Sequence, residues 1–354
     1  MKDAARAVRV TRRQLVRGSA AALLLAAGRL APARAATPSA GEAKLSGTMT
    51  LYNGQHESTT DPLVKAFEAK TGVKVRVRSA ESDEFASQIL EEGSRSPADV
   101  FYSEESAPMN LLAEKRMLGP VAAGTLKQIP EQYSDAQGRW VGVSARARVL
   151  VYNTGMVAAS ALPQSIYDLT EAAWKDKVGF VPTSGGFREQ LAAIIVLAGE
   201  DRAKSWLEGL KRNGKIYRAN GDLLDAVDRG QIATGLINHY YWFQEAAEIG
   251  AAKMRSQLHY FGHHDPGALL NVSPAGMLKS SKHPDLAQAF LAFLVSEEGQ
   301  QVLAKVSTEY PLRPGVTSNA PLKPLAELEP PAISVGELGD GQNALELEQE
   351  VDLL

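Results

Sequence analysis

Two consecutive tyrosines, Tyr240 and Tyr241, carry the most distinctive chemistry of this chain. Far upstream, His56 and Glu104 each follow a short apolar segment. Phenolate, imidazole and carboxylate form a hard ligand set, and the chain has no cysteine to supply a thiolate. Because a free phenol ionises only near pH ~10, two phenolates on one metal require a strong Lewis acid. Ferric iron meets that requirement better than zinc or magnesium does.

One carboxylate and two phenolates balance the charge of Fe3+, and four protein ligands leave roughly two octahedral positions for water or a small anion. Taken singly, each residue has a plainer interpretation. An aromatic run is usually core or interface, His56 could cap a helix, and Glu104 with Glu105 could be a solvated pair. Only the combination favours a metal. Neighbouring tyrosines diverge on a regular strand or helix, so sharing one ion requires an irregular strand-to-helix turn.

A candidate anion site lies in the run Pro-Thr-Ser-Gly-Gly at residues 182–186, just before an expected helix. Free backbone N–H groups and the helix dipole make such a terminus suitable for phosphate or carbonate. A plain glycine turn with Ser184 as helix cap explains the run equally well. Two asparagines could add donors or serve in turns. The candidate anion-binding residues are Ser184, Gly185, Gly186, Asn220 and Asn238.

Three further histidines require an interpretation. The run His263-His264-Asp265 could suggest zinc, but adjacent histidines rarely share one ion and a Pro-Gly pair follows, so we expect a loop. His239 directly precedes the tyrosine pair. It could support the ligands from behind, face away from them or act as an alternate ligand, and of these we prefer the first.

The periodicity of the chain predicts alternating strands and helices in two halves. Strands are expected at 49–52, 73–77 and 98–102, with helices at 62–70 and 85–92 between them. The pattern restarts with strands at 149–152, 177–181 and 233–237 and helices at 188–197 and 203–210. The strand at 149–152 is expected to cross between the halves. Mostly parallel sheets bind ligands beyond the carboxyl ends of their strands, where His56, Glu104 and Tyr240 fall.

The N-terminus reads as an export signal. Arg12-Arg13 precedes an apolar run at 20–27 that is too short to span a bilayer, and Ala33-Arg34-Ala35 supplies a cleavage site. Residues 1–35 carry a net charge of +7, so removing them from the total of −3 leaves about −10. An acidic mature chain argues against nucleic-acid binding. We expect export by the twin-arginine pathway to a bacterial periplasm.

The chain lacks the common nucleophile-elbow, zinc-protease and phosphate-loop motifs. It resembles the periplasmic ferric-ion-binding proteins, the bacterial transferrins that serve iron ABC transporters, from about residue 48 to the C-terminus. The runs that carry the resemblance are 51–56, 97–102, 183–185, 237–242 and 265–269. The family pattern differs in having Gln at Glu105, Ala at Gly186 and Asn at His239.

The resemblance implies an α/β two-lobe periplasmic binding protein fold, type II-like, with mixed but mostly parallel sheets, a hinge and an interlobe cleft. It places the iron ligands at His56, Glu104, Tyr240 and Tyr241, with phosphate, carbonate or citrate as a synergistic anion. It implies a monomer that catalyses no reaction and delivers Fe3+ to an inner-membrane ABC permease. The expected boundaries are 46–146 plus 271–321 for lobe one and 147–270 plus 322–354 for lobe two.

Two other functions fit the same residues. A binding protein of this fold for an organic anion or phosphate ester would use the Ser184 loop alone. A metal-dependent hydrolase would need a general base beside an open metal site, and the sequence offers no convincing one.

Overall fold

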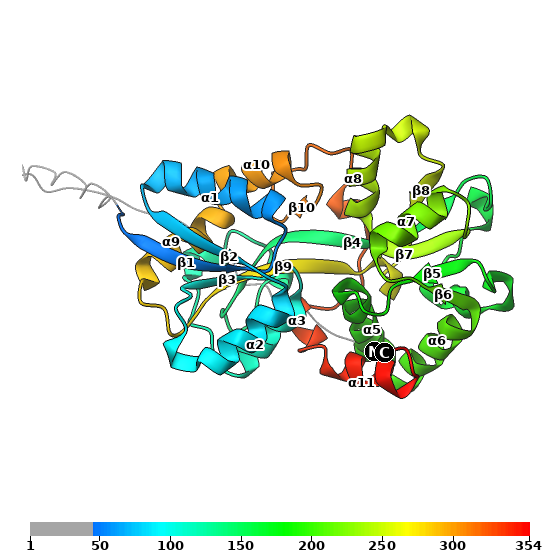
Figure 1. Ribbon diagram of the computed structural model, residues 1–354, viewed down its shortest axis with the longest axis horizontal. Coiled ribbons are helices and arrows are strands. Elements are labelled where there is room, and N and C mark those ends of the chain that lie inside the picture. The colour runs from blue at the N-terminus through cyan, green and yellow to red at the C-terminus, as the bar shows by residue number, and fades with distance from the viewer. Residues whose placement is uncertain (1–44) are drawn as a thin grey trace, which may run out of the picture. The chain divides into compact units, whose positions relative to one another are not determined.

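The computed structural model describes residues 45–354. The expected signal segment, residues 1–35, lies outside this range. Among the described residues, no helix combines the length and the apolar character that crossing a membrane requires. Two groups of strands, each flanked by helices, are joined by long strands that run between them (Figure 1).

The first group of strands contains β1 and its neighbours. The strand order is β2-β1-β3-β9-β4, with β1 parallel to β2 and β3, and β9 antiparallel to β3 and β4. Its strands are β1 (Thr48–Asn53), β2 (Lys74–Ser79), β3 (Val100–Tyr102), β9 (Leu270–Met277), β10 (Tyr310–Pro311) and the first half of β4 (Val141–Asn153). Its helices are α1 (Glu57–Thr71), α2 (Ser82–Glu92), α3 (Ser106–Glu114), α4 (Ala123–Leu126), α9 (Pro284–Leu294) and α10 (Glu297–Val306). We call this part the first half.

The second group continues from β4 in the order β4-β7-β5-β6, with β8 also paired to β4. Its strands are β5 (Val178–Phe180), β6 (Gly214–Ile216), β7 (Thr234–Asn238) and β8 (Ser256–His259). Its helices are α5 (Gly185–Ala198), α6 (Glu200–Asn213), α7 (Asn220–Asp228) and α8 (His239–Ile249). The strands β5, β6 and β7 are parallel, as the sequence pattern predicts. We call this part the second half.

The strand β4 belongs to both halves. Residues 141–147 pair with β9, and residues 148–153 pair with β7 and β8. All 13 of its residues are buried. The strand is therefore enclosed on both faces, including the face that carries Arg146 and Arg148. The expected crossing strand at 149–152 is therefore confirmed and extends eight residues further toward the N-terminus.

The C-terminal segment contacts both halves. Val335, in a short 3-10 helix at Val335–Leu338, packs with the core of the first half, and Asn110 of α3 donates hydrogen bonds to the carbonyl groups of Val335 and Gly339. The following helix α11 (Gln342–Glu350) buries Ala344 and Leu347 against the second half. The segment thus runs across the space between the halves.

Candidate metal and anion site

The site is built at helix N-termini that follow strands. His56 and Glu105 occupy the N-cap positions of α1 and α3, and Ser184 and Asn238 occupy those of α5 and α8. Asn220 is the first residue of α7. Every predicted site residue lies within three residues of one of these termini. The positive ends of the helix dipoles therefore face the same region, which favours anionic ligands there.

His56 presents one ring nitrogen to the site. Its backbone N–H donates to Gln55 Oε1 over 2.7 Å. Its Nε2 atom is shielded from solvent, has no hydrogen-bond partner within residues 45–354, and lies 3.4 Å from Glu104 Oε1. The Glu104 carboxylate, at this distance from the ring, raises the pKa of His56 against the opposing effect of burial. A buried nitrogen without a partner is a suitable metal ligand once the ring is neutral.

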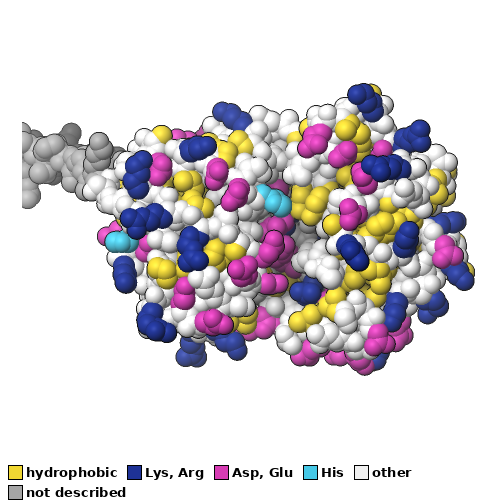
Figure 2. All heavy atoms as spheres, in the orientation of Figure 1, with side chains coloured by type: hydrophobic (Ala, Val, Ile, Leu, Met, Phe, Trp, Pro, Cys, Tyr) yellow, Lys and Arg dark blue, Asp and Glu magenta, His cyan; other side chains and the backbone are white. Residues whose placement is uncertain are grey.

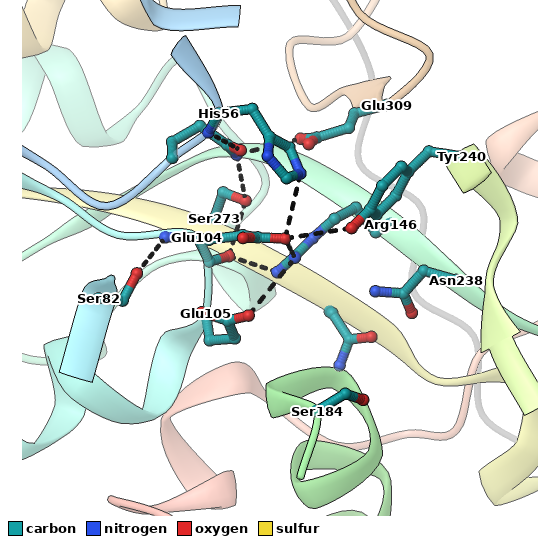
Figure 3. A network of polar contacts seen from close by, with 12 residues as sticks. His56, Ser82, Glu104, Glu105, Arg146, Ser184, Asn238, Tyr240, Ser273 and Glu309 are labelled. Carbon is teal, nitrogen blue, oxygen red and sulfur yellow. Dashed lines mark hydrogen bonds and ion pairs between the residues drawn. The ribbon is translucent and has the colours of Figure 1, made fainter. Parts of the chain in front are cut away.

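Glu104 lies between β3 and α3, and the side chains of His56, Arg146 and Tyr240 all lie near its carboxylate (Figure 3). Arg146 Nη1 donates to its Oε1 over 2.6 Å, and Ser273 Oγ donates to its backbone carbonyl over 2.8 Å. Burial alone would raise the pKa of Glu104, but the charge of Arg146 and the neighbouring His56 outweigh it and lower the pKa to about 2. Glu104 is therefore ionised at any physiological pH.

Tyr240 and Tyr241 occupy the first turn of α8, directly after β7. The Tyr240 hydroxyl donates to Glu104 Oε1 over 3.3 Å, and Asn220 Nδ2 donates to the Tyr241 hydroxyl over 3.3 Å. Their rings stack with centroids 4.2 Å apart. Burial, with a further contribution from Glu104, raises the pKa of both tyrosines. Both phenols are therefore neutral in the metal-free protein, and a bound cation must displace their protons.

The anion loop has the geometry expected of a helix start. Ser184 Oγ accepts a hydrogen bond from Phe187 N over 3.2 Å, so it caps α5 as the plainer interpretation proposed. A methyl group built on Gly186 would lie 3.0 Å from Asn238 Nδ2. The Oδ1 atom of Asn220 is buried without a hydrogen-bond partner in the described part of the chain. Asn238 thus lies next to the loop, and Asn220 lies next to the Tyr241 hydroxyl.

Glu105 lies between the predicted metal ligands and the anion loop (Figure 3). Its Oε1 is 3.9 Å from Arg146 Nη1, and a methyl group built on Gly185 would lie 2.7 Å from the same oxygen. Burial and the adjacent charge of Glu104 raise the pKa of Glu105 well above its ordinary value. Figure 2 shows acidic side chains gathered in the furrow between the two halves.

Two buried arginines belong to the site and escaped the sequence analysis. Arg146 and Arg148 lie on β4 and are 0% and 1% exposed. Arg148 Nη1 donates to Asn238 Oδ1 over 3.2 Å, and its Nε donates to Gln190 Oε1 over 3.3 Å. Burial lowers the pKa of Arg148 to about 10, whereas Glu104 and Glu105 offset burial and raise that of Arg146. Both remain cations at neutral pH.

The ring nitrogens of His239 bond the backbone rather than the tyrosines, which differs from the preferred interpretation of the sequence. Its Nδ1 accepts from the Ala147 backbone N–H over 3.1 Å, and its Nε2 lies 2.8 Å from the Thr308 carbonyl oxygen. Both ring nitrogens are thus used by the backbone. Burial lowers the pKa of His239 to about 3, so the ring is neutral.

The run at residues 263–265 forms a loop, as expected. Asp265 caps a short 3-10 helix at Pro266–Ala268 and accepts hydrogen bonds from Ser165 Oγ and the Ile166 backbone N–H. Within residues 45–354, no three His, Asp or Glu side chains come together in a group that could hold a metal, and this includes the side chains of the loop.

Comparison with known proteins identifies the family. The family model described as bacterial extracellular solute-binding protein matches residues 52–306. The major ferric iron-binding protein of Neisseria meningitidis is 42% identical over 310 residues, which cover 86% of this chain and 93% of that protein. These matches confirm the expectation of a solute-binding protein rather than an enzyme.

Solved structures agree with this assignment. Iron-bound HitA from Pseudomonas aeruginosa is 47% identical, with a TM-score of 0.82, and the match covers 86% of this chain and 99% of that one. A Trichodesmium protein in complex with iron and citrate is 29% identical, with a TM-score of 0.78 and the same coverage. Both confirm the α/β periplasmic binding protein fold predicted from the sequence. The chain therefore belongs to the ferric-ion-binding proteins among the bacterial extracellular solute-binding proteins.

Proposed function

We propose that this protein captures Fe3+ between its two halves, using His56, Glu104, Tyr240 and Tyr241 as ligands. The observation that carries the proposal is the convergence on one carboxylate oxygen. Glu104 Oε1 lies 3.4 Å from His56 Nε2 and 3.3 Å from the Tyr240 hydroxyl, although the three residues come from three separate segments. Tyr241 joins them through its stacked ring. One neutral nitrogen and three anionic oxygens suit a hard trivalent ion.

The electrostatics of the metal-free site support this assignment. Arg146 donates to the same Glu104 oxygen over 2.6 Å, so the guanidinium balances the carboxylate when no ion is present. An arriving Fe3+ takes over that oxygen and drives the phenolic protons into solution, because the trivalent charge greatly exceeds that of a single guanidinium. Iron capture is therefore an exchange of cations and protons within a preformed set of ligands.

A small anion completes the coordination in this proposal. The backbone N–H groups at Ser184, Gly185 and Gly186, with the amides of Asn220 and Asn238, provide the donors. The buried Arg148 supplies positive charge next to Asn238. The Trichodesmium relative, which holds iron with citrate, makes citrate one reasonable candidate beside phosphate and carbonate. The acidic Glu105 at the loop is a feature that any such anion must accommodate.

The cellular role follows from the family. The protein is periplasmic. We infer export by the twin-arginine pathway from the Arg12-Arg13 leader, and delivery of Fe3+ by the monomeric mature chain to an inner-membrane ABC permease. The two lobes, 46–146 with 271–321 and 147–270 with 322–354, would close on the ion by rotation about β4 and β9.

Ferric loading of the purified mature chain tests the function. Ferric citrate is added, excess is removed, and the visible spectrum is recorded together with the metal content. Stoichiometric iron with a phenolate-to-iron absorption band is the expected result. A colourless protein that binds a phosphate ester or organic anion without iron would instead favour the same-fold anion binder.

A further inference from the structure

We propose that Glu189 is a positioning residue for iron capture, because it caps helix α3 from across the space between the halves and so fixes the segment that carries Glu104. Glu189 lies on α5, in the second half, one turn after the glycines of the anion loop. Helix α3 starts at Ser106 in the first half, two residues after Glu104. The proposal rests on the proposed function for its iron-dependent part.

The contact is short, buried and formed by a charged acceptor. The backbone N–H of Ser106 donates to Glu189 Oε1 over 2.6 Å, and Ser106 Oγ donates to the same oxygen. The other carboxylate oxygen accepts from Asn271 Nδ2, on the connecting strand β9. Glu189 is 3% exposed, and Ser106 and Asn271 are fully buried. A carboxylate removed from water in this way requires all of its hydrogen bonds.

The first turn of α3 depends on this contact. Glu105 is its N-cap residue, but the Glu105 side chain makes no capping hydrogen bond within the described chain. A helix start with unpaired N–H groups normally takes an acceptor from its own N-cap side chain. Here the acceptor comes from another helix in the other half. Opening the two halves would therefore separate Ser106 from Glu189 and leave both groups to solvent.

The contact also joins the two functional loops. Ser106 directly follows Glu104 and Glu105 in the chain. Glu189 follows Gly185 and Gly186 by one turn of α5. The carboxylate of Glu189 thus ties the start of the predicted anion-binding helix to the segment that bears a predicted iron ligand. Helix α3 can take its cap only when the halves are closed, so formation of the cap favours the arrangement in which Glu104 meets the tyrosines.

The variant Glu189→Gln tests the proposal, because it keeps the shape of the side chain but removes its charge. The control is Glu208→Gln, an exposed glutamate on α6 in the same half. Ser106→Ala provides a second route that leaves α5 unchanged, and the double variant measures the coupling between the two positions. Each protein is loaded with ferric citrate and challenged with excess hydroxamate chelator, and the rate of loss of the visible band is measured.

Glu189→Gln should release iron roughly 10-fold to 100-fold faster than wild type, because the amide offers one neutral acceptor in place of two charged ones and its NH2 group cannot accept from Ser106 or Asn271. Ser106→Ala should show a smaller increase, and the double variant should release iron about as fast as Glu189→Gln alone. The wavelength of the band should not change, since both tyrosines remain. Additive effects of the two substitutions, or release at the wild-type rate in both single variants, would overturn the proposal.

A measurement without iron separates this proposal from the proposed function. Donor and acceptor dyes, one on each half, report the closed population of the metal-free protein. That population should fall in Glu189→Gln and Ser106→Ala and remain at the wild-type level in Glu208→Gln. If wild type takes up no iron but the closed population still falls in both variants, the capping role of Glu189 is supported and the proposed iron binding is refuted. Equal closed populations in all four proteins would refute the cap.

Discussion

The rings of Tyr240 and Tyr241 stack with their centroids 4.2 Å apart and their planes inclined by 29°, although the residues are adjacent in the chain. Adjacent side chains on a helix point about 100° apart. In the first turn of α8 no preceding turn restricts the side chains, so the two rings can turn toward each other. The stack directs both hydroxyl groups to the same side, one toward Glu104 and the other toward Asn220.

Removal of either hydroxyl should weaken iron binding. Tyr240→Phe and Tyr241→Phe each delete a phenolate, so affinity should fall by more than the roughly 10-fold to 100-fold that loss of an outer-sphere partner costs. The visible band should also shift or weaken. Tyr133→Phe, in a half-buried tyrosine outside the site, serves as the control and should bind as wild type. Wild-type colour and affinity in both site variants would exclude the tyrosines as ligands.

Iron loading should release protons from the tyrosines. Burial raises the pKa of Tyr240 and Tyr241, so each phenol carries a proton at neutral pH until the ion displaces it. Affinity should therefore increase with pH, and calorimetry in buffers of different ionisation enthalpy should show net proton release. Tyr240→Phe should release one proton fewer per iron. A loading reaction that releases no protons in any buffer would contradict the assignment of phenolate ligands.

Substitution of Gly185 should impair anion-assisted iron retention. A Cβ atom there would lie 2.7 Å from Glu105 Oε1, so Gly185→Val must displace Glu105 or keep the halves apart. The backbone at Gly185 is not in the left-handed region, so the fold should persist. Gly124→Val is a matched control, because a Cβ at Gly124 meets nothing within 4 Å. Iron retention in phosphate, carbonate and citrate should fall for Gly185→Val only, while circular dichroism stays constant in both.

Glu348, on the C-terminal helix, should make the free energy of unfolding decrease as pH rises. Glu348 is fully buried, with Oε2 3.1 Å from Arg188 Nε and Oε1 without a partner in the described residues. Burial outweighs Arg188 and raises the pKa of Glu348 to about 7. Between about pH 4.5 and 7 the folded chain keeps a proton that the unfolded chain has released, so the free energy of unfolding decreases across that interval, by up to roughly 3 kcal/mol.

Chemical denaturation at several pH values measures this effect. Glu348→Gln cannot titrate, so its stability relative to wild type should increase from pH 4.5 to pH 8. Glu350→Gln, on the same helix but exposed, should follow wild type at every pH. A constant difference between wild type and Glu348→Gln over this range would show that Glu348 does not titrate near neutrality.

The sequence predicted which strand ends lie near one another. The four expected ligands lie beside strand ends that periodicity locates well, and the structure brings His56, Glu104 and Tyr240 together. The helix expected at 62–70 in fact begins at Glu57, with Pro62 inside it, because His56 already leaves the strand. Pro62 concealed that start, since proline usually marks the first turn of a helix.

The arginines and Glu189 show what periodicity cannot supply. From sequence alone, Arg146 and Arg148 would be expected at the surface, because charged side chains are rarely buried without partners. Their partners, Glu104 and Gln190, lie 42 residues away in the chain in each case, and only the folded structure brings them together. Glu189 likewise meets Ser106 across 83 residues. Local patterns contain no trace of such pairings.

The two arginines on β4 also limit how this protein can vary in length. They are two residues apart on one strand, so they point to the same face, and Ala145, Ala147 and Val149 point to the other. A single residue inserted or deleted between Arg146 and Arg148 would place the two guanidinium groups on opposite faces of the strand, and one of them would leave the site. Loops elsewhere can lengthen or shorten, but the spacing along β4 is fixed by the charges that it carries into the site.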